Sequence, residues 1–317
     1  MKKIKMRKAK SITIREGSEK FYKWCRVNNY SDYTTNFYKK AIHNFSLFYD
    51  LDSPVSDINR DLMEDYALYL ADRGISSMSV HTYLRGVMRI VNYLADKDII
   101  KRFTITMPKV ETPVKEVYTE SELKKLLKKP DVKNCKFSEF RNWVMVNYLL
   151  GTGQRRNTVT NIKIKDLDLE NALVRLNVTK NKKATILPIT KSLVDILEEY
   201  LDFRGGSPDD YLFCNESGKK LSNESCTNSI RKYNLRRGVD KTSIHVFRHT
   251  FAYMSIKNNI DIVRLQQLLC HSNIKTTQGY LRSFGFEDLR ENYEMFNPLE
   301  NFINKNTVAK NFKERQK

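Results

Sequence analysis

Two histidines, an arginine and a tyrosine toward the end of the chain have the residue types needed for chemistry on a phosphate group. His245 and Arg248 stand three residues apart in a segment expected to be helical, so both side chains leave one face and can reach the same anion. His271 ends the next helical stretch, and Tyr280 follows nine residues later, past an expected helix cap at Thr276. The spacing predicts a cationic pocket with a tyrosine shortly after it in the chain.

The residues around this pocket resemble a family signature. The chain reads His-Val-Phe-Arg at 245–248, Leu-Cys-His at 269–271 and then Tyr280, which is similar to the H-x-x-R, L-G-H and following tyrosine of the tyrosine recombinases of the phage integrase family. Thr-Gly-Gln-Arg at 152–155 resembles the family's T-G-x-R, which implies that Arg155 is the first catalytic arginine. The family's hairpin motif, counted back eight residues from Pro188, implies that Lys180 is the catalytic lysine. The resemblance covers nearly the whole chain.

This resemblance implies DNA strand cleavage by Tyr280, and the chemistry of the residues agrees with that role. Tyr280 would attack the scissile phosphate and form a 3′-phosphotyrosyl link. A phenol with an ordinary pKa of about 10 needs a cationic surround to gain phenolate character, which Arg155 and Arg248 would supply. Each guanidinium also matches two phosphate oxygens with one planar fork, so replacing either arginine by lysine should be damaging.

Three further residues complete the expected catalytic set. Lys180, on the predicted hairpin, would protonate the departing 5′ oxygen, although two other lysines in the same turn leave a solvated charge run as the alternative. His245 would assist proton transfer to or from Tyr280, and His271 would hydrogen-bond a non-bridging phosphate oxygen. The set requires no metal and no cofactor. Because the bond energy stays in the phosphotyrosine, rejoining of the strands would require no ATP.

Three positions near the predicted site need separate comment. Thr158 stands where the family usually has an acidic residue that supports the catalytic arginine and histidine. Cys270 stands where the family usually has glycine, a position expected to need only a small side chain. His249 follows Arg248 directly and is expected to pack in the interior or to bind the backbone.

The composition favours a partner rich in phosphate. The chain of 317 residues has 56 Lys and Arg against 37 Asp and Glu, which gives a net charge of +19. Basic side chains release condensed counterions when they neutralise phosphates, so this balance indicates nucleic acid, with a merely basic soluble protein as the alternative. The five cysteines are far apart and lack C-x-x-C spacing, which argues against disulfides and a zinc site. Without an apolar run for a membrane span or signal peptide, the expected location is the cytoplasm, in association with the nucleoid.

The predicted fold is mainly α-helical with a small β-hairpin. Apolar residues recur at helical spacing up to residue 105, after which two prolines and the loss of that spacing indicate an extended linker. Strand-like alternation at 174–178 and 184–189 predicts a hairpin in a mixed α+β catalytic domain. Five regions are expected: a basic N-terminal segment 1–16, a helical core-binding domain 17–105 that clamps DNA, a linker 106–118, a catalytic domain 119–296 and a C-terminal tail 297–317.

Single residues predict several helix boundaries. Gly74 is expected to end one helix and Ser79 to cap the next. Thr119 is expected to open a helix with a capping box, and Thr190 to cap a helix that Gly205 ends.

The expected function is site-specific recombination of double-stranded DNA with inverted-repeat half-sites. Each monomer would clamp one half-site between its two domains, and four protomers would form a synapse. By the family resemblance, the apolar segment 284–299 would dock into a neighbouring protomer, with packing on its own domain as the alternative. The basic start is too short for the folded arm-binding domain that some integrases carry, which favours a transposon-type or a chromosome-resolving recombinase. Of these two, we expect integration or excision of a mobile element. A second recombinase or an accessory directionality factor could take part.

Two other functions stay open at the level of sequence. A type IB topoisomerase shares the chemistry but lacks site choice, and the compact two-domain layout and the nine-residue spacing argue against it. A sequence-specific DNA-binding protein of recombinase descent would no longer cleave DNA, and Thr158 is the one hint of that.

Overall fold

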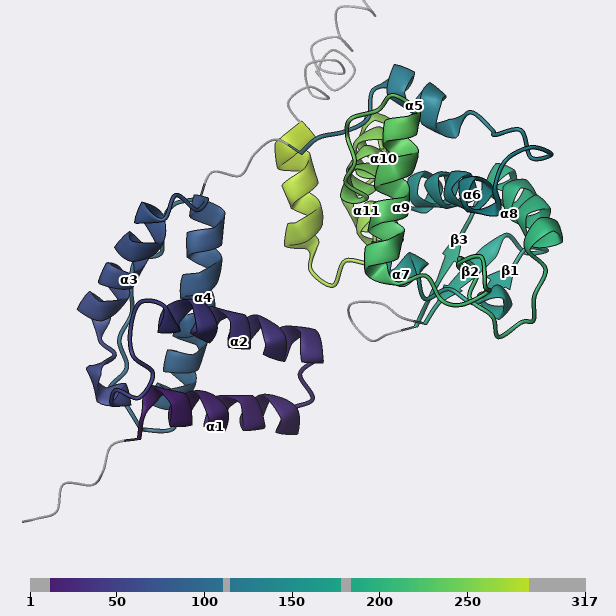
Figure 1. Ribbon diagram of the computed structural model, residues 1–317. Coiled ribbons are helices and arrows are strands. Elements are labelled where there is room, and N and C mark those ends of the chain that lie inside the picture. The colour runs from purple at the N-terminus through teal and green to yellow at the C-terminus, as the bar shows by residue number, and fades with distance from the viewer. Residues whose placement is uncertain (1–11, 111–114, 178–183, 285–317) are drawn as a thin grey trace, which may run out of the picture. The chain divides into compact units, whose positions relative to one another are not determined.

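A computed structural model describes residues 12–110, 115–177 and 184–284, and the chain divides into two compact units, 1–113 and 114–317 (Figure 1). The described elements are mainly helical with one small antiparallel sheet, which confirms the predicted fold class. In the described part of the chain, no helix is both long enough and apolar enough to cross a membrane.

The first unit is a bundle of four helices around its longest member. These helices are α1 (Ile14–Val27), α2 (Asp32–Ser46), α3 (Arg60–Asp72) and α4 (Ser77–Asp96), with a short 3-10 turn η1 (Val55–Asp57) between α2 and α3. α4 contacts each of the other three. A Cβ on Gly86 would lie 2.5 Å from Cβ of Ala41, so glycine at this position allows α4 to approach α2 closely.

The helix boundaries of this unit follow the sequence with one correction. Gly74, at a φ of +68°, lies just beyond the end of α3, where only glycine adopts the left-handed backbone without cost. The cap of α4 is Ser76, whose side chain accepts a hydrogen bond from the backbone N–H of Ser79. The prediction that Ser79 is the cap was therefore wrong by three residues, because either serine fits the preference for a short polar side chain.

The second unit is built around one central helix. Its helices are α5 (Glu120–Leu127), α6 (Phe137–Thr152), α7 (Arg156–Val159), α8 (Lys191–Arg204), α9 (Asn223–Arg236), α10 (His245–Lys257), α11 (Ile262–Leu268) and a last helix at 274–284, drawn in yellow-green in Figure 1. α6 contacts α5, α8, α9 and α10. The predicted capping box at Thr119, the cap at Thr190 and the end at Gly205 are all present.

A three-stranded antiparallel sheet lies in the same unit. Its strands are β1 (Leu167–Asp168), β2 (Leu173–Leu176) and β3 (Thr185–Pro188), in that order across the sheet, with Arg175 paired with Ile186. β2 and β3 are the predicted hairpin. β1 was not predicted, because two residues are too few to show an alternating pattern.

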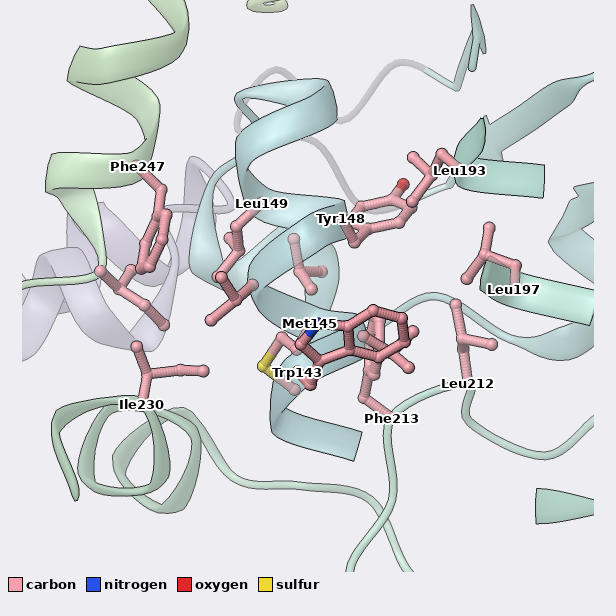
Figure 2. Packing of buried hydrophobic residues seen from close by; sticks show 14 of the residues in the cluster. Trp143, Met145, Tyr148, Leu149, Leu193, Leu197, Leu212, Phe213, Ile230 and Phe247 are labelled. Carbon is pink, nitrogen blue, oxygen red and sulfur yellow. The ribbon is translucent and has the colours of Figure 1, made fainter. Parts of the chain in front are cut away.

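The core of the second unit fixes the position of α10. Figure 2 shows Phe247 of α10 turned toward α6 side chains that include Leu149, and Phe247 is fully buried. Removing such a ring typically costs about 3 to 5 kcal/mol, because a cavity replaces its contacts. The rotation of α10 about its own axis is thus set by packing, and with it the direction of the neighbouring Arg248.

Candidate active site

Separate elements bring together the predicted catalytic residues that the structure describes. α10 carries His245 and Arg248, the turn after α11 carries His271, and the helix at 274–284 carries Tyr280. Oδ1 of Asn273 accepts a hydrogen bond from the backbone N–H of Lys275 at the start of this last helix. The predicted cap at Thr276 was therefore wrong: the helix begins earlier, and Thr276 lies inside it.

The guanidinium of Arg248 is buried and bound to the main chain on two sides. Nη1 donates to the carbonyl oxygen of Gly153 at 2.6 Å, and Nη2 donates to that of Leu269 at 2.8 Å. Burial, and next the charge of Arg155, lower the pKa of Arg248 to about 10, so it stays cationic at neutral pH. Carbonyl oxygens satisfy the donors without neutralising the charge.

His271 links Arg248 to the tyrosine helix. Its Nε2 lies 2.6 Å from Nη2 of Arg248, and because a guanidinium can only donate, Nε2 is the acceptor. Nδ1 therefore carries the hydrogen of the neutral ring and donates it to Oγ1 of Thr277 at 2.8 Å. Both ring nitrogens are engaged in this structure, so a direct bond from His271 to a phosphate oxygen requires Nε2 to exchange its partner.

Arg155 enters the pocket from the sharp turn that ends α6. Gly153 closes that helix at a φ of +60°, and a Cβ there would lie 2.5 Å from Cδ1 of Phe251, so glycine is required on two counts. Two residues later Arg155 is half-buried, and its Nη1 donates to the carbonyl oxygen of Cys270 at 3.4 Å. Burial lowers the pKa of Arg155 from its usual value. The T-G-x-R segment thus places its arginine beside Arg248.

Tyr280 is buried, with only 4% of its surface exposed, and its ring is enclosed by cationic and aromatic groups. The ring stacks on that of His271, with centroids 6.3 Å apart and an angle of 14° between the planes. Nζ of Lys115 lies 4.3 Å from the ring centroid and donates to the carbonyl oxygen of Gly279 at 2.7 Å. Burial raises the pKa of Tyr280, and the charge of Arg248 opposes that shift. Tyr280 is therefore a neutral phenol at pH 7.

The hydroxyl of Tyr280 is bound by a histidine that the sequence did not single out for chemistry. Nδ1 of His249 lies 3.1 Å from Oη of Tyr280. The sequence predicted that His249 packs in the interior or binds the backbone. Its ring packs against that of the buried Tyr280, and the partner of Nδ1 is a side-chain hydroxyl rather than the backbone. A usable signal was present, because His249 follows His245 by one helical turn and so lies on the same face of α10.

His245 occupies the first position of α10. Partial desolvation, and then the charges of Arg156, Arg248 and Arg155, lower its pKa from the usual value, so its ring is neutral at pH 7. His245 is exposed at the surface of α10, within the range of the arginine charges. The ring nitrogen within hydrogen-bonding distance of the tyrosine hydroxyl belongs to His249.

Three positions remain from the sequence analysis: the predicted catalytic Lys180, and Thr158 and Cys270, which differ from the family pattern. Lys180 lies outside the described residues, between β2 and β3. Thr158 is buried in α7. In the described part of the chain, neither Arg155 nor Arg248 has a carboxylate partner. Cys270 has a φ of +50°, so this position holds a left-handed backbone, which the sequence did not predict.

This arrangement can bind a phosphate and present a phenol to it. Arg155 and Arg248 contribute two positive charges that no side chain described here neutralises, and Tyr280 lies against them. Within the described ranges, no group of three or more His, Cys, Asp and Glu side chains is arranged to hold a metal ion. The chemistry that the described residues support is nucleophilic attack by a tyrosine on an anion-bound phosphorus.

Comparison with known families gives two matches that together span most of the chain. Residues 116–285 match the profile of the Phage integrase family, and residues 18–101 match that of the Phage integrase N-terminal SAM-like domain. A tyrosine recombinase from Pseudothermotoga lettingae is 30% identical over 262 residues, which cover 80% of this chain and 89% of that protein.

Solved structures with the same fold include several recombinases. The crystal structure of XerA recombinase is 27% identical, with a TM-score of 0.52, over 90% of this chain and 99% of that one. The Tn1549 transposon integrase in complex with transposon right end DNA has a TM-score of 0.72 at 18% identity, over 90% of this chain and 99% of that one. XerH site-specific recombinase bound to palindromic difH substrate has a TM-score of 0.68 at 21% identity, over 86% of this chain and 83% of that one.

Proposed function

Because this chain belongs to the phage integrase family of tyrosine recombinases, we propose that it cleaves and rejoins DNA at specific sites through a 3′-phosphotyrosyl intermediate formed on Tyr280. The observation that carries this proposal is the burial of a neutral tyrosine against two guanidinium groups that have no carboxylate partner in the described part of the chain. An isolated buried cation pair is costly unless an anion completes it, and a phosphodiester is the anion that a nucleophile in this place could use.

In the proposed step, Oη of Tyr280 attacks the scissile phosphorus as the bond to the 5′ oxygen breaks. Arg155 and Arg248 stabilise the charge that develops on the non-bridging oxygens, a contribution of typically 10²- to 10³-fold for each such donor. His271 supports the same oxygens, either directly after exchanging its partner or by orienting Arg248 through the 2.6 Å contact. A histidine takes part in proton transfer to or from Tyr280. The sequence predicted His245 for this role, and His249 has the ring nitrogen that lies 3.1 Å from the tyrosine hydroxyl.

The leaving 5′ oxygen needs a proton, and we assign its delivery to Lys180. Support comes from the hairpin itself: β2 and β3 are paired on either side of the segment that contains Lys180. An ammonium group loses one proton to the departing alkoxide and regains it when the strands are rejoined.

The proposed substrate is double-stranded DNA with inverted-repeat half-sites, and the proposed active assembly is a tetramer. The net charge of +19 supports a DNA partner, because each contact with a phosphate releases condensed counterions. Phe284, the first residue of the apolar segment 284–299, packs against Tyr253 of its own chain with ring centroids 5.2 Å apart. The rest of the segment, for which docking into a neighbouring protomer is proposed, lies outside the described residues.

Among recombination reactions, we propose integration or excision of a mobile element in the cytoplasm, on nucleoid DNA. The fold shared with the Tn1549 transposon integrase supports this proposal. The alternative is chromosome resolution, and the chain is also similar to relatives named XerC and XerD, among them the XerD of Staphylococcus epidermidis at 28% identity. Both reactions are compatible with a second recombinase or an accessory directionality factor.

The test is to recover DNA that is covalently attached to the protein. Wild type and Tyr280→Phe would be expressed in the host, and the attached DNA would be sequenced. Adducts with wild type alone, clustered at one short inverted repeat, are the expected result. Adducts scattered over the genome would indicate a topoisomerase instead, and the absence of adducts from both proteins would indicate a binder that no longer cleaves.

A further inference from the structure

We propose that His249, rather than His245, is the catalytic base that takes the proton from the Tyr280 hydroxyl during strand cleavage. This inference rests on the proposed function, because it assigns a role within the cleavage step. It assigns a chemical role to a residue that the sequence predicted to pack in the interior or to bind the backbone.

The geometry places the base and the nucleophile in direct contact. Nδ1 of His249 lies 3.1 Å from Oη of Tyr280, within the range of about 2.6 to 3.2 Å in which a side chain can take up a proton. The two rings are tilted by 60° with their centroids 5.6 Å apart. Both residues lie within the second unit, on α10 and on the helix at 274–284.

A proton can move along this contact in one tautomer of His249. A neutral imidazole carries its hydrogen on one ring nitrogen and a lone pair on the other. With the hydrogen on Nε2, Nδ1 accepts the single phenolic hydrogen of Tyr280 across the 3.1 Å contact. The charge of Arg248 opposes the rise in the pKa of Tyr280 and so favours the phenolate that this transfer produces.

Among the residues that the structure describes, the groups that act on His249 are cationic or neutral. Lys115 lies just before α5, His245 and Arg248 lie on α10, and Tyr280 lies on the last helix. Desolvation first, and then the charges of Lys115, His245 and Arg248, lower the pKa of His249 to about 4, so its ring is neutral and its nitrogen lone pair is free at pH 7.

This environment also explains why the tyrosine would stay protonated until DNA binds. A base with so low a pKa does not remove a proton from a buried phenol by itself. When a phosphate enters, its negative charge offsets the neighbouring cations and favours the imidazolium form. Proton transfer is then coupled to attack, so the nucleophile is activated only with its substrate in place.

The complete step balances. The bond from Oη of Tyr280 to phosphorus forms, the bond from phosphorus to the 5′ oxygen breaks, and the phenolic proton moves to Nδ1 of His249. The 5′ oxygen takes its proton from the acid proposed above, Lys180. In rejoining, a 5′ hydroxyl attacks phosphorus and Nδ1 of His249 returns its proton to Oη of Tyr280.

The experiment compares His249→Asn with His249→Ala in single-turnover formation of the covalent adduct. Asparagine can place a carbonyl oxygen near the position of Nδ1 and accept the hydrogen bond, but it cannot hold the proton, whereas alanine does neither. We expect both variants to be about 10²-fold slower at pH 7, with unchanged DNA affinity. His43→Asn, the same change at an exposed histidine of α2, is the matched control and should react like wild type.

The pH profile gives a readout that a structural role would not move. Between about pH 6 and pH 9 the wild-type rate should stay flat, because its base is neutral throughout. The rate of His249→Asn should rise about tenfold per pH unit, since only the spontaneously ionised phenol reacts. If asparagine restores the wild-type rate and a flat profile, His249 only positions the tyrosine and the proposal is wrong.

A sulfur leaving group separates the two proton transfers. DNA with a 5′-bridging phosphorothiolate at the scissile bond releases a thiolate, which needs no protonation. The defect of His249→Asn should persist on this substrate, and recovery of the wild-type rate would instead assign His249 to the leaving group. If the Asn variant does not fold, the pH profile of His249→Ala gives the same test, because alanine also leaves only the spontaneously ionised phenol to react. If wild type itself forms no adduct, the proposed function fails rather than this assignment alone.

Discussion

Replacement of Arg248 by lysine should damage both folding and catalysis, because the guanidinium has more fixed partners than an ammonium can reach. Arg248 donates to the carbonyl oxygens of Gly153 and Leu269 and to Nε2 of His271, over distances of 2.6, 2.8 and 2.6 Å. A lysine is shorter and lacks the planar fork, so we expect it to keep one of these bonds. Two buried acceptors then lose their donor.

The expected size of the effect follows from those two acceptors. Each buried group left without a partner costs about 1 to 3 kcal/mol, so the free energy of unfolding of the second unit should fall by about 2 to 6 kcal/mol. For a domain of this size that corresponds to a fall in Tm of at least about 4 °C. Cleavage should fall by a further 10²- to 10³-fold, since the transition state loses a bidentate donor.

The assay combines thermal unfolding with adduct formation under conditions where each protein is folded. Arg264→Lys is the matched control, because Arg264 is 80% exposed on α11 and pairs with Asp261 at 3.0 Å. That variant should change stability by less than about 0.5 kcal/mol. A Tm of Arg248→Lys within 1 °C of wild type, together with more than about a tenth of the wild-type cleavage rate, would refute the reasoning.

Three further predictions concern single contacts around the pocket. Cys270→Gly should raise the stability of the second unit by about 1 kcal/mol, because glycine relieves the left-handed backbone at a φ of +50°; an unchanged or lower Tm would contradict this. Gly153→Ala should lower stability by about 2 to 5 kcal/mol through its own positive φ and the 2.5 Å approach to Phe251, measured by denaturant unfolding, and a midpoint near that of wild type would show that the turn can relax. Lys115→Met should slow cleavage about tenfold at saturating DNA by removing the cation 4.3 Å from the Tyr280 ring, and an unchanged single-turnover rate would show that this contact serves folding alone.

The sequence predicted the parts of the site that depend on local spacing. His245 and Arg248 share a helix, and their separation of three residues is enough to place them on one face. Arg155 was identified through the T-G-x-R resemblance, and the structure shows the reason for its glycine, since Gly153 ends α6 in the left-handed conformation. The helical character of the chain and the β2–β3 hairpin followed from periodicity alone.

What the sequence did not predict depends on contacts between elements. His249 meets Tyr280 across 31 positions of chain, and no local pattern encodes which side of α10 the last helix covers. The backbone conformation of Cys270 was missed for a related reason: a cysteine carries no signal for a positive φ, as a glycine does. β1 is set by its pairing with β2, so its two residues have no signature of their own.

Main-chain carbonyl oxygens anchor both arginines, and this determines which groups can contribute to the pH dependence of the reaction rate. Peptide oxygens do not titrate in the pH range of proteins, and every residue type supplies one, so neither acidification nor side-chain exchange at Leu269 or Cys270 removes these anchors. The positive charge of the two arginines therefore stays constant from acid pH up to the pKa of Arg248 at about 10. A rate measured against pH in that window reports on the protons of the histidines, Lys115, the tyrosine and the leaving-group acid, because neither arginine has a carboxylate partner among the residues that the structure describes.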